Sequence, residues 1–290
     1  MKKFFIIKNY YQKEGLLVAI IQLINFFFRK ILRANFRIDT PLDNLKKYLL
    51  KKVINASNRK IMSGIYKNVY LHPESNWNFH DLSTKLFGFY EEQIQENIIK
   101  IKKKYKLINI VNIGAGDGYH IISLIKNNYF KKGYAFEIDK KSQLIIHKNL
   151  VRNKIKNRVK IFGEGNYNSI AKNIDVKKIN KTFFLIDIEG GEFNFFSEEN
   201  INFFNKSFFI IEIHNNTNTS FLKKFYYLIR KNFFITKIDN TSRNPFKLSN
   251  KYFDKFTDDE RFLLMSEGRS EKQIWLALIP KNTSSQLDLV

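Results

Sequence analysis

The chain contains no cysteine. This absence excludes a disulfide framework, thiolate metal ligands and a cysteine nucleophile. No cleavable signal peptide is evident, because no small-residue cleavage pattern follows the first apolar run. We therefore expect a cytoplasmic protein, with a peripheral position on the inner face of the membrane as a second option.

Acidic residues are scarce beside basic ones. The 27 Asp and Glu against 50 Lys and Arg give a formal net charge of +23. Such an excess commonly indicates an acidic partner, either nucleic acid or an anionic membrane surface. Lys, Asn, Ile and Phe are nevertheless abundant in strands and loops alike, as an AT-rich coding bias would produce. Charge alone is therefore weak evidence, and we do not expect nucleic-acid binding.

The longest uninterrupted apolar stretch near the N-terminus is too short to span a bilayer, which needs about 20 apolar residues. In the segment GLLVAIIQLINFFFRKILR, over 15–33, polar residues recur every three or four positions: Gln22, Asn25, Arg29 and Arg33. This spacing predicts a helix with a broad apolar face. Residues 1–50 carry ten Lys and Arg against three acids. Residues 1–35 could thus lie on an anionic membrane surface, or the helix could pack on the main domain.

From about residue 80, short apolar strands alternate with segments long enough for helices. The predicted strands are 108–113, 133–137, 158–162, 182–188, 207–213, 232–239 and 273–279. The first five are apolar on both faces, which is typical of a parallel sheet covered on both sides. The last two suit an antiparallel pair at the sheet edge. We expect a basic, largely helical extension over 1–80, an α/β domain over 81–280 and a loose tail over 281–290.

A glycine-rich turn, NIGAGDGYH, follows the first strand. Its candidate ligand-binding residues are Asn112, Gly114, Gly116, Asp117 and Gly118. Glycines at alternate positions let the backbone approach a ligand closely, while the next helix presents its N-terminal N–H groups. The pattern is G-x-G-x-G and not the G-x-G-x-x-G of a dinucleotide fold. By itself the turn is a weak signal, since many such turns are purely structural.

An acidic residue ends the second strand in the sequence AFEID. Glu137 there can accept hydrogen bonds from both ribose hydroxyls of a nucleoside, although a solvated carboxylate would look the same. The turn and the acid together favour an adenosine-bearing cofactor. After the third strand, FGEGN places Glu164 where it could lie beside an adenine.

Four ionisable residues follow the fourth and fifth strands. Asp187 and Glu189 end the fourth, and Glu212 and His214 end the fifth. Ligands bind at the carboxyl ends of parallel strands, and side chains two apart share a face, so we expect all four to converge. His214 is the best candidate for a general base because its ordinary pKa of about 6.5 lies near neutral pH.

The three carboxylates, Asp187, Glu189 and Glu212, could orient His214 or hold a divalent cation such as Mg²⁺ through oxygen ligands. We favour the version without metal. The metal stays open because clustered like charges raise one another's pKa when no cation is present.

Two further segments, around Glu192 and over 259–275, also carry ionisable residues. Glu192 lies in the first turn of a predicted helix over 191–204, where the helix dipole favours a carboxylate, and we leave it out of the site. The polar segment 259–275, with Arg261, Glu267 and Arg269, could lie over an acceptor pocket or form a solvated hairpin.

The motifs NIGAGDG, AFEID, LIDIEGGE and IIEIH, in this order and spacing, resemble the FkbM-type branch of class I S-adenosylmethionine-dependent methyltransferases over about 80–280. The resemblance implies a Rossmann-like, doubly wound, mostly parallel seven-stranded sheet in the order 3-2-1-4-5-7-6. It also implies S-adenosylmethionine as cofactor and O-methylation of a sugar or polyhydroxyl acceptor in glycan or surface polysaccharide biosynthesis. The sequence departs from the family pattern at Asn112, usually Asp, at Ile138, usually Pro, and at Leu185, often Lys. The last is the most serious, because it removes a positive group near Asp187.

Other functions stay open. The charge suggests an RNA or other nucleic-acid methyltransferase, but base N-methylation usually relies on an Asn/Asp-Pro-Pro-aromatic turn after the fourth strand, and DIEGG is not one. A catalytically inactive, membrane-associated binding module would not need the four ionisable residues. We therefore expect an enzyme with a small-molecule or lipid-linked glycan acceptor.

Overall fold

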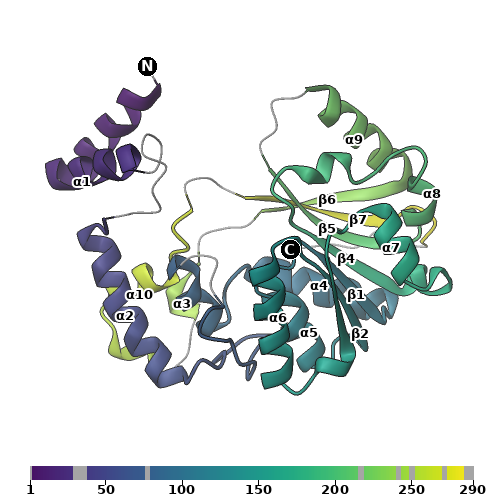
Figure 1. Ribbon diagram of the computed structural model, residues 1–290, viewed down its shortest axis with the longest axis horizontal. Helices are drawn as coiled ribbons and strands as arrows, with labels where there is room; N and C mark the ends of the chain where they lie inside the picture. The colour runs from purple at the N-terminus through teal and green to yellow at the C-terminus, as the bar shows by residue number, and fades with distance from the viewer. Residues whose placement is uncertain are drawn as a thin grey trace.

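One seven-stranded sheet forms the centre of the protein. The computed structural model describes residues 2–28, 38–75, 79–214, 219–239, 243–247, 252–269 and 273–283. Its strands are β1 (Asn109–Ile113), β2 (Lys132–Phe136), β3 (Val159–Phe162), β4 (Thr182–Ile186), β5 (Phe208–Ile213), β6 (Phe233–Asp239) and β7 (Ile274–Pro280). They are arranged in the order β3-β2-β1-β4-β5-β7-β6 (Figure 1). The predicted fold class and strand order are confirmed.

The pairing of the strands decides which strand ends lie side by side. Neighbours among β1 to β5 are parallel, whereas β7 is antiparallel to both β5 and β6, so the predicted edge pair is confirmed. Asn112 in β1 lies beside Leu185 in β4, which lies beside Ile210 in β5. The carboxyl ends of these strands therefore lie close together, beside the point where the strand order reverses.

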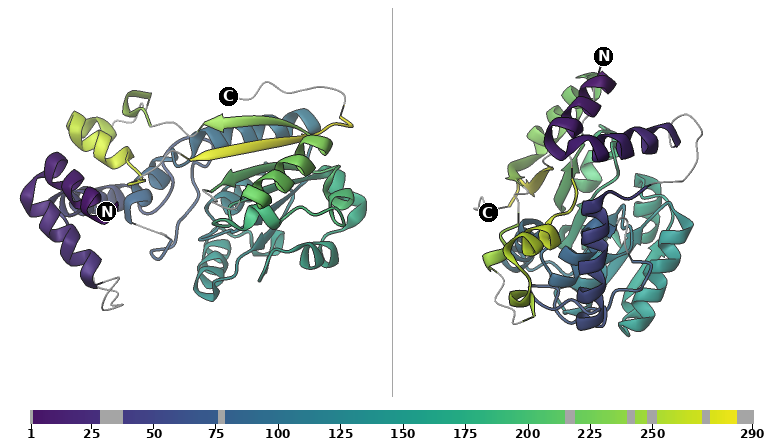
Figure 2. Two further views of the ribbon diagram at one scale, coloured as in Figure 1. Left: turned by 90° about the horizontal axis from the view of Figure 1, so that it is seen from above. Right: turned by 90° about the vertical axis from the view of Figure 1, so that its left-hand side faces the viewer.

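Helices cover both faces of the sheet (Figures 1 and 2). One face packs against α4 (Glu92–Tyr105), α5 (Tyr119–Lys126) and α6 (Lys140–Arg152), the other against α7 (Tyr167–Asn173), α8 (Ile201–Phe204) and α9 (Thr219–Asn232). Within β4, Leu185 belongs to the first core and Ile186 to the second. Burial on both sides is the reason these strands read as continuous apolar runs.

Three further helices pack together at one end of the sheet (Figure 1): α2 (Pro41–Ser57), α3 (Phe79–Phe87) and α10 (Asp258–Met265). Capping boxes start α2 and α10, at Thr40 and Thr257 respectively. Leu49 and Val53 of α2 belong to the same core as Leu185 of β4. The position of a domain boundary near residue 80 stays a prediction.

The N-terminal helix differs from the predicted one. Helix α1 (Lys2–Phe26) starts earlier and is kinked at Gly15, whose φ of 85° is non-helical. Residues 29–33 of the predicted helix lie outside the described residues, as do residues 284–290 of the predicted tail. In the part of the chain that the structure describes, no helix is long and apolar enough to cross a membrane.

The helix predicted over 191–204 is also wrong. A short 3₁₀ helix (Gly191–Asn194) and the one-turn α8 take its place. The segment buries Phe193, Phe195 and Phe196 together, in the core shared with Phe209. Consecutive buried aromatic residues do not fit the single apolar stripe of a long surface helix.

Candidate functional site

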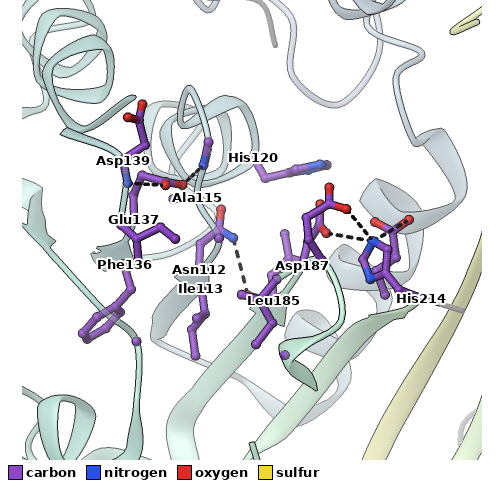
Figure 3. Close-up of a pocket in the computed structure, with 18 of the residues that line it drawn as sticks. Asn112, Ile113, Ala115, His120, Phe136, Glu137, Asp139, Leu185, Asp187 and His214 are labelled. Carbon is purple, nitrogen blue, oxygen red and sulfur yellow. Dashed lines mark hydrogen bonds and ion pairs between the residues drawn. The ribbon is translucent and has the colours of Figure 1, made fainter. Parts of the chain in front are cut away.

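A pocket of about 1140 Å³ opens at the carboxyl ends of the central strands. Its walls come from the turns after β1, β2, β3 and β4, the end of β5, helix α3 and residues 267–269. In Figure 3, Glu137 and His214 lie on opposite sides, with Asp187 between them. The structure thus brings the predicted catalytic residues and the predicted cofactor-binding residues other than Gly118 into one cavity.

The glycine turn is shaped by a close contact between two chain segments. A Cβ on Gly114 would lie 1.6 Å from the Asp187 carbonyl oxygen, so only glycine fits there. Gly116 has a φ of +55°, and a Cβ on it would meet no atom within 4 Å. The Gly116 N–H donates to Glu137 Oε2 at 2.7 Å. The turn is therefore locked to β4 at one glycine and leaves open space at the other.

Glu137 lies at the end of β2 and is largely buried. Its Oε1 accepts a hydrogen bond from the Asp139 N–H at 2.9 Å, and its Oε2 accepts the one from Gly116 (Figure 3). Each carboxylate oxygen can accept more than one hydrogen bond, so Glu137 can still bind a diol.

The other predicted cofactor-binding residues differ in where they lie. Asn112 lines the pocket and donates to the Leu185 carbonyl at 3.4 Å, and Glu164 is an exposed residue of the same wall. Asp117 also lines the pocket, and its oxygens accept hydrogen bonds from the Tyr119 N–H and from Lys85 Nζ, directly before the N-cap residue Gly118 of α5. Gly118 does not line the pocket and faces Ile122 of α5. Its predicted place beside the cofactor is wrong, because the turn has already entered the helix.

His214 is surrounded by the three predicted carboxylates. Its Nε2 lies 3.5 Å from Glu189, 3.7 Å from Asp187 and 3.9 Å from Glu212. The alternation argument that linked Asp187 to Glu189 does not hold, because β4 ends at Ile186 and Glu189 adopts a left-handed φ of 51°. This turn holds Glu189 in an exposed position near the imidazole.

Glu192, interpreted from the sequence as a helix-start residue outside the site, contacts His214 in the structure. Its side chain is fully buried, and its Oε1 lies 3.3 Å from His214 Nδ1. The same carboxylate accepts from the N–H groups of His214, at 2.7 Å, and Gly190, at 2.9 Å. Because a carboxylate accepts, Nδ1 carries the donated proton, and the Nε2 lone pair of the neutral ring faces the pocket.

The clustered charges shift one another's pKa. Desolvation, reinforced by Glu91 and Glu189, raises the pKa of Asp187 to about 7. Desolvation together with repulsion from Asp187 and Glu91 raises the pKa of Glu212 to about 10. The hydrogen bond to Glu192 raises the pKa of His214. Glu212 is therefore protonated at neutral pH while no cation is bound.

The residues present also fit a divalent cation. Asp187, Glu212 and His214 each offer a ligand atom, and the three atoms lie within 4.8 Å of one another. Asp187 Oδ1 is buried and accepts no hydrogen bond from any of the described residues. Carboxylate oxygens suit Mg²⁺, and an imidazole suits transition metals. The sequence suggested Asp187, Glu189 and Glu212 as the metal ligands. In the structure Glu189 is exposed, and His214 is the third candidate ligand beside Asp187 and Glu212.

The opposite wall carries a second charged network, which the sequence did not predict as one unit. Arg269 donates to Glu91 Oε1 at 2.7 Å and to Glu267 Oε2 at 2.7 Å. Glu91 Oε2 lies 2.9 Å from His120 Nε2, and His120 Nδ1 lies 3.0 Å from the Tyr66 hydroxyl. Segment 267–269 therefore lines the pocket, as one of the two interpretations of that segment predicted, while Arg261 pairs with Asp258.

Comparisons with known proteins give weak similarities. No family model and no curated protein sequence matches this chain. The fold is similar to an O-methyltransferase from Bacillus cereus in complex with SAH (14% identity, TM-score 0.45, 89% of this chain and 97% of that chain). It is also similar to the O-methyltransferase TomG from Streptomyces achromogenes in complex with SAM (9%, 0.45, 89% and 96%). The B. subtilis M1A22 tRNA methyltransferase TrmK is a third example (10%, 0.40, 65% and 63%). Similarities at this level do not show a shared function or substrate.

Proposed function

We propose that the protein is an S-adenosylmethionine-dependent O-methyltransferase that acts on a hydroxyl group of a sugar or another polyhydroxyl acceptor. One observation carries the proposal: Glu137, a ribose-binding candidate beside a glycine turn, and His214, an oriented base, face the same pocket. When bound, S-adenosylmethionine supplies the electrophilic methyl group. Positioning of the acceptor oxygen then provides much of the rate.

His214 acts as the general base in this proposal. With Nδ1 bonded to Glu192, the Nε2 lone pair accepts the proton of the acceptor hydroxyl as the new C–O bond forms. Asp187 and Glu189 lie within 3.7 Å of Nε2, where their charge stabilises the imidazolium that results. The products are a methyl ether, S-adenosylhomocysteine and a proton on Nε2.

The polar pocket wall supports a polyhydroxyl acceptor. Carboxylates accept hydrogen bonds from hydroxyl groups, and Glu189 and Glu91 line the cavity together with the protonated Glu212, which can donate as well as accept. Gln273 donates to Glu212, and Arg269 supplies donors beside Glu91. The same acids repel a phosphate backbone, so the site itself does not favour nucleic acid in spite of the net charge.

Calorimetry with S-adenosylhomocysteine tests the cofactor assignment. We expect the wild type to bind, and Glu137→Gln to bind at least tenfold more weakly because it loses charged hydrogen bonds to the ribose, roughly 1.5 to 3 kcal/mol each. The exposed Glu199→Gln is the matched control and should bind like the wild type. Absence of binding by the wild type would refute the proposed cofactor.

Transfer of labelled methyl groups to a panel of monosaccharides and glycosides tests the chemistry. His214→Ala should lower turnover by about 10²- to 10⁴-fold, while its affinity for S-adenosylhomocysteine stays unchanged. Turnover by the wild type should persist in EDTA. If EDTA abolishes it and Mg²⁺ restores it, a cation at Asp187, Glu212 and His214 replaces the metal-free version.

A further inference from the structure

Helix α1 exposes a row of large apolar side chains. Leu16, Ile20, Leu23 and Phe27 recur every three or four residues, and each is between 44% and 63% exposed. We call these four residues the α1 row. Single exposed apolar residues are normal on soluble proteins, but a continuous row marks an interaction surface.

On its inner side, α1 buries Val18 and Ala19 and makes a polar contact through Asn25. The Asn25 side chain donates to the Ile38 carbonyl at 2.8 Å and accepts from the Ile38 N–H at 2.6 Å. This pair ties the helix to the segment that leads into α2. The side of α1 that carries Val18, Ala19 and Asn25 is therefore used within the chain, whereas the α1 row is turned outward.

Helix α2 also exposes large apolar side chains. Leu42, Leu45 and Tyr48 are each between 42% and 56% exposed, and the exposed Lys51 and Lys52 follow. Lys52 Nζ lies 4.3 Å from the centre of the Tyr48 ring. Aromatic and aliphatic residues flanked by lysines are typical of a surface that meets lipid headgroups. Figure 2, right, shows α1 and α2 facing the viewer on one side of the molecule.

The inner face of α2 is close to the pocket. The buried Lys46 donates to the carbonyl of Ser266, directly before residues 267–269 of the pocket wall. Helix α2 also packs on α3, whose Lys85 lines the same pocket. A partner that covers the outer face of α2 would thus lie one helical layer from the cavity.

We propose that α1 and α2 dock on the surface of an anionic lipid bilayer and bring the pocket to an acceptor that a lipid carries in that bilayer. The lipid-carried acceptor rests on the proposed function, whereas the docking does not. Residues 1–50 carry ten Lys and Arg against three acids, and these basic residues, apart from the buried Lys46, complement anionic headgroups. A net charge of +23 disfavours a second copy of the same chain as the occupant.

Flotation of the full chain with vesicles tests the docking. One vesicle is phosphatidylcholine alone, and the other contains equal parts of phosphatidylcholine and phosphatidylglycerol. We expect the wild type to float with the anionic vesicles only. Ile20→Glu/Leu23→Glu should partition at least tenfold more weakly, since it loses buried apolar area and gains repulsion from the headgroups.

The matched control is Leu144→Glu/Val151→Glu on α6, which makes the same change of charge at residues 53% and 51% exposed. It should float like the wild type. Equal losses of vesicle binding in both double variants would show that binding depends on net charge alone, and would overturn the proposal. So would a wild type that stays unbound, or a dimer in light scattering that only the α1 variant dissociates.

Two further measurements separate the possible failures. Thermal unfolding should show that both double variants are folded, because the substituted side chains are exposed. Calorimetric binding of S-adenosylhomocysteine should be unchanged in both. Docking without any such binding would leave the membrane proposal standing and refute the proposed function.

Discussion

At the residue scale, His214 depends on a carboxylate that lies outside both strands. Glu192 accepts hydrogen bonds from the N–H groups of Gly190 and His214 and also contacts the imidazole. It therefore connects the turn after β4 to the end of β5. A helix-dipole role, which the sequence suggested, explains none of these three contacts.

Replacement of Glu192 should reveal this positioning role. Glu192→Ala leaves two half-buried N–H groups without their acceptor, which should cost roughly 1 to 3 kcal/mol in the free energy of unfolding. Turnover should fall, while affinity for S-adenosylhomocysteine stays close to wild type. Glu192→Gln retains one side-chain acceptor and should restore part of both losses in urea unfolding and turnover assays. Equal turnover in all three proteins would show that Glu192 does not orient His214.

Two glycines of the turn should respond differently to the same change. In Gly114→Ala the new methyl group would overlap the Asp187 carbonyl, so we expect a loss of folded protein. In Gly116→Ala the methyl group meets open space, and the left-handed φ should cost only about 1 to 2 kcal/mol. That methyl group would point into the pocket and weaken S-adenosylhomocysteine binding. Thermal unfolding and calorimetry distinguish the two, and similar stability in both variants would contradict the close contact at Gly114.

At the element scale, Glu91 joins three separate parts of the chain. It precedes α4, contacts His120 on α5, and pairs with Arg269 after α10. Burial alone would raise the pKa of Glu91, but the His120 hydrogen bond and the charges of His120 and Arg269 outweigh it and lower the pKa to about 2. The ionised carboxylate of Glu91 therefore links the segments that form the opposite wall of the pocket.

This ion pairing should make stability depend on acid pH. Since the folded pKa of Glu91, about 2, lies below the unfolded value of about 4.3, its contribution is fully present above pH 4.3. It is lost as the pH falls towards 2. Glu91→Gln should destabilise the fold by about 3 to 5 kcal/mol at pH 7, and by less at pH 3.5. Urea unfolding at both values measures the difference; a constant difference would contradict the pKa assignment.

The sequence predicted a largely helical segment over 1–80 but not the bounds of helix α2 within it. Helix α2 buries Asp43 and Lys46, which find polar partners in Thr40 and Ser266, and it exposes Leu42, Leu45 and Tyr48. Burial of charged residues on one face and exposure of apolar ones on the other remove the periodic pattern by which helices are recognised. The strands, buried on both faces, kept their pattern and were predicted within a few residues.

At the scale of the whole molecule, the basic excess and the acidic candidate site lie in different parts of the protein. The net charge is +23, yet the residues around His214 are mainly carboxylates. The basic excess of residues 1–50 begins with α1 and continues into α2, at the end of the molecule near the pocket wall. At the position of the departure, Leu185 is buried in the sheet, and the charge of Arg269, from a distant segment, partly offsets the raised pKa of Glu212.

The motifs by which the sequence resembles a methyltransferase family implied the strand order. The sequence alone also predicted the glycine turn and the residues that meet at the carboxyl ends of β4 and β5. It could do so because buried strands and strand-end residues are local patterns, and parallel pairing brings strand ends together. Only the tertiary structure placed Glu192 under His214, turned Gly118 away from the pocket and brought Glu91, His120 and Arg269 to the opposite wall. Those contacts join segments up to 178 residues apart, so they depend on packing and not on any local period.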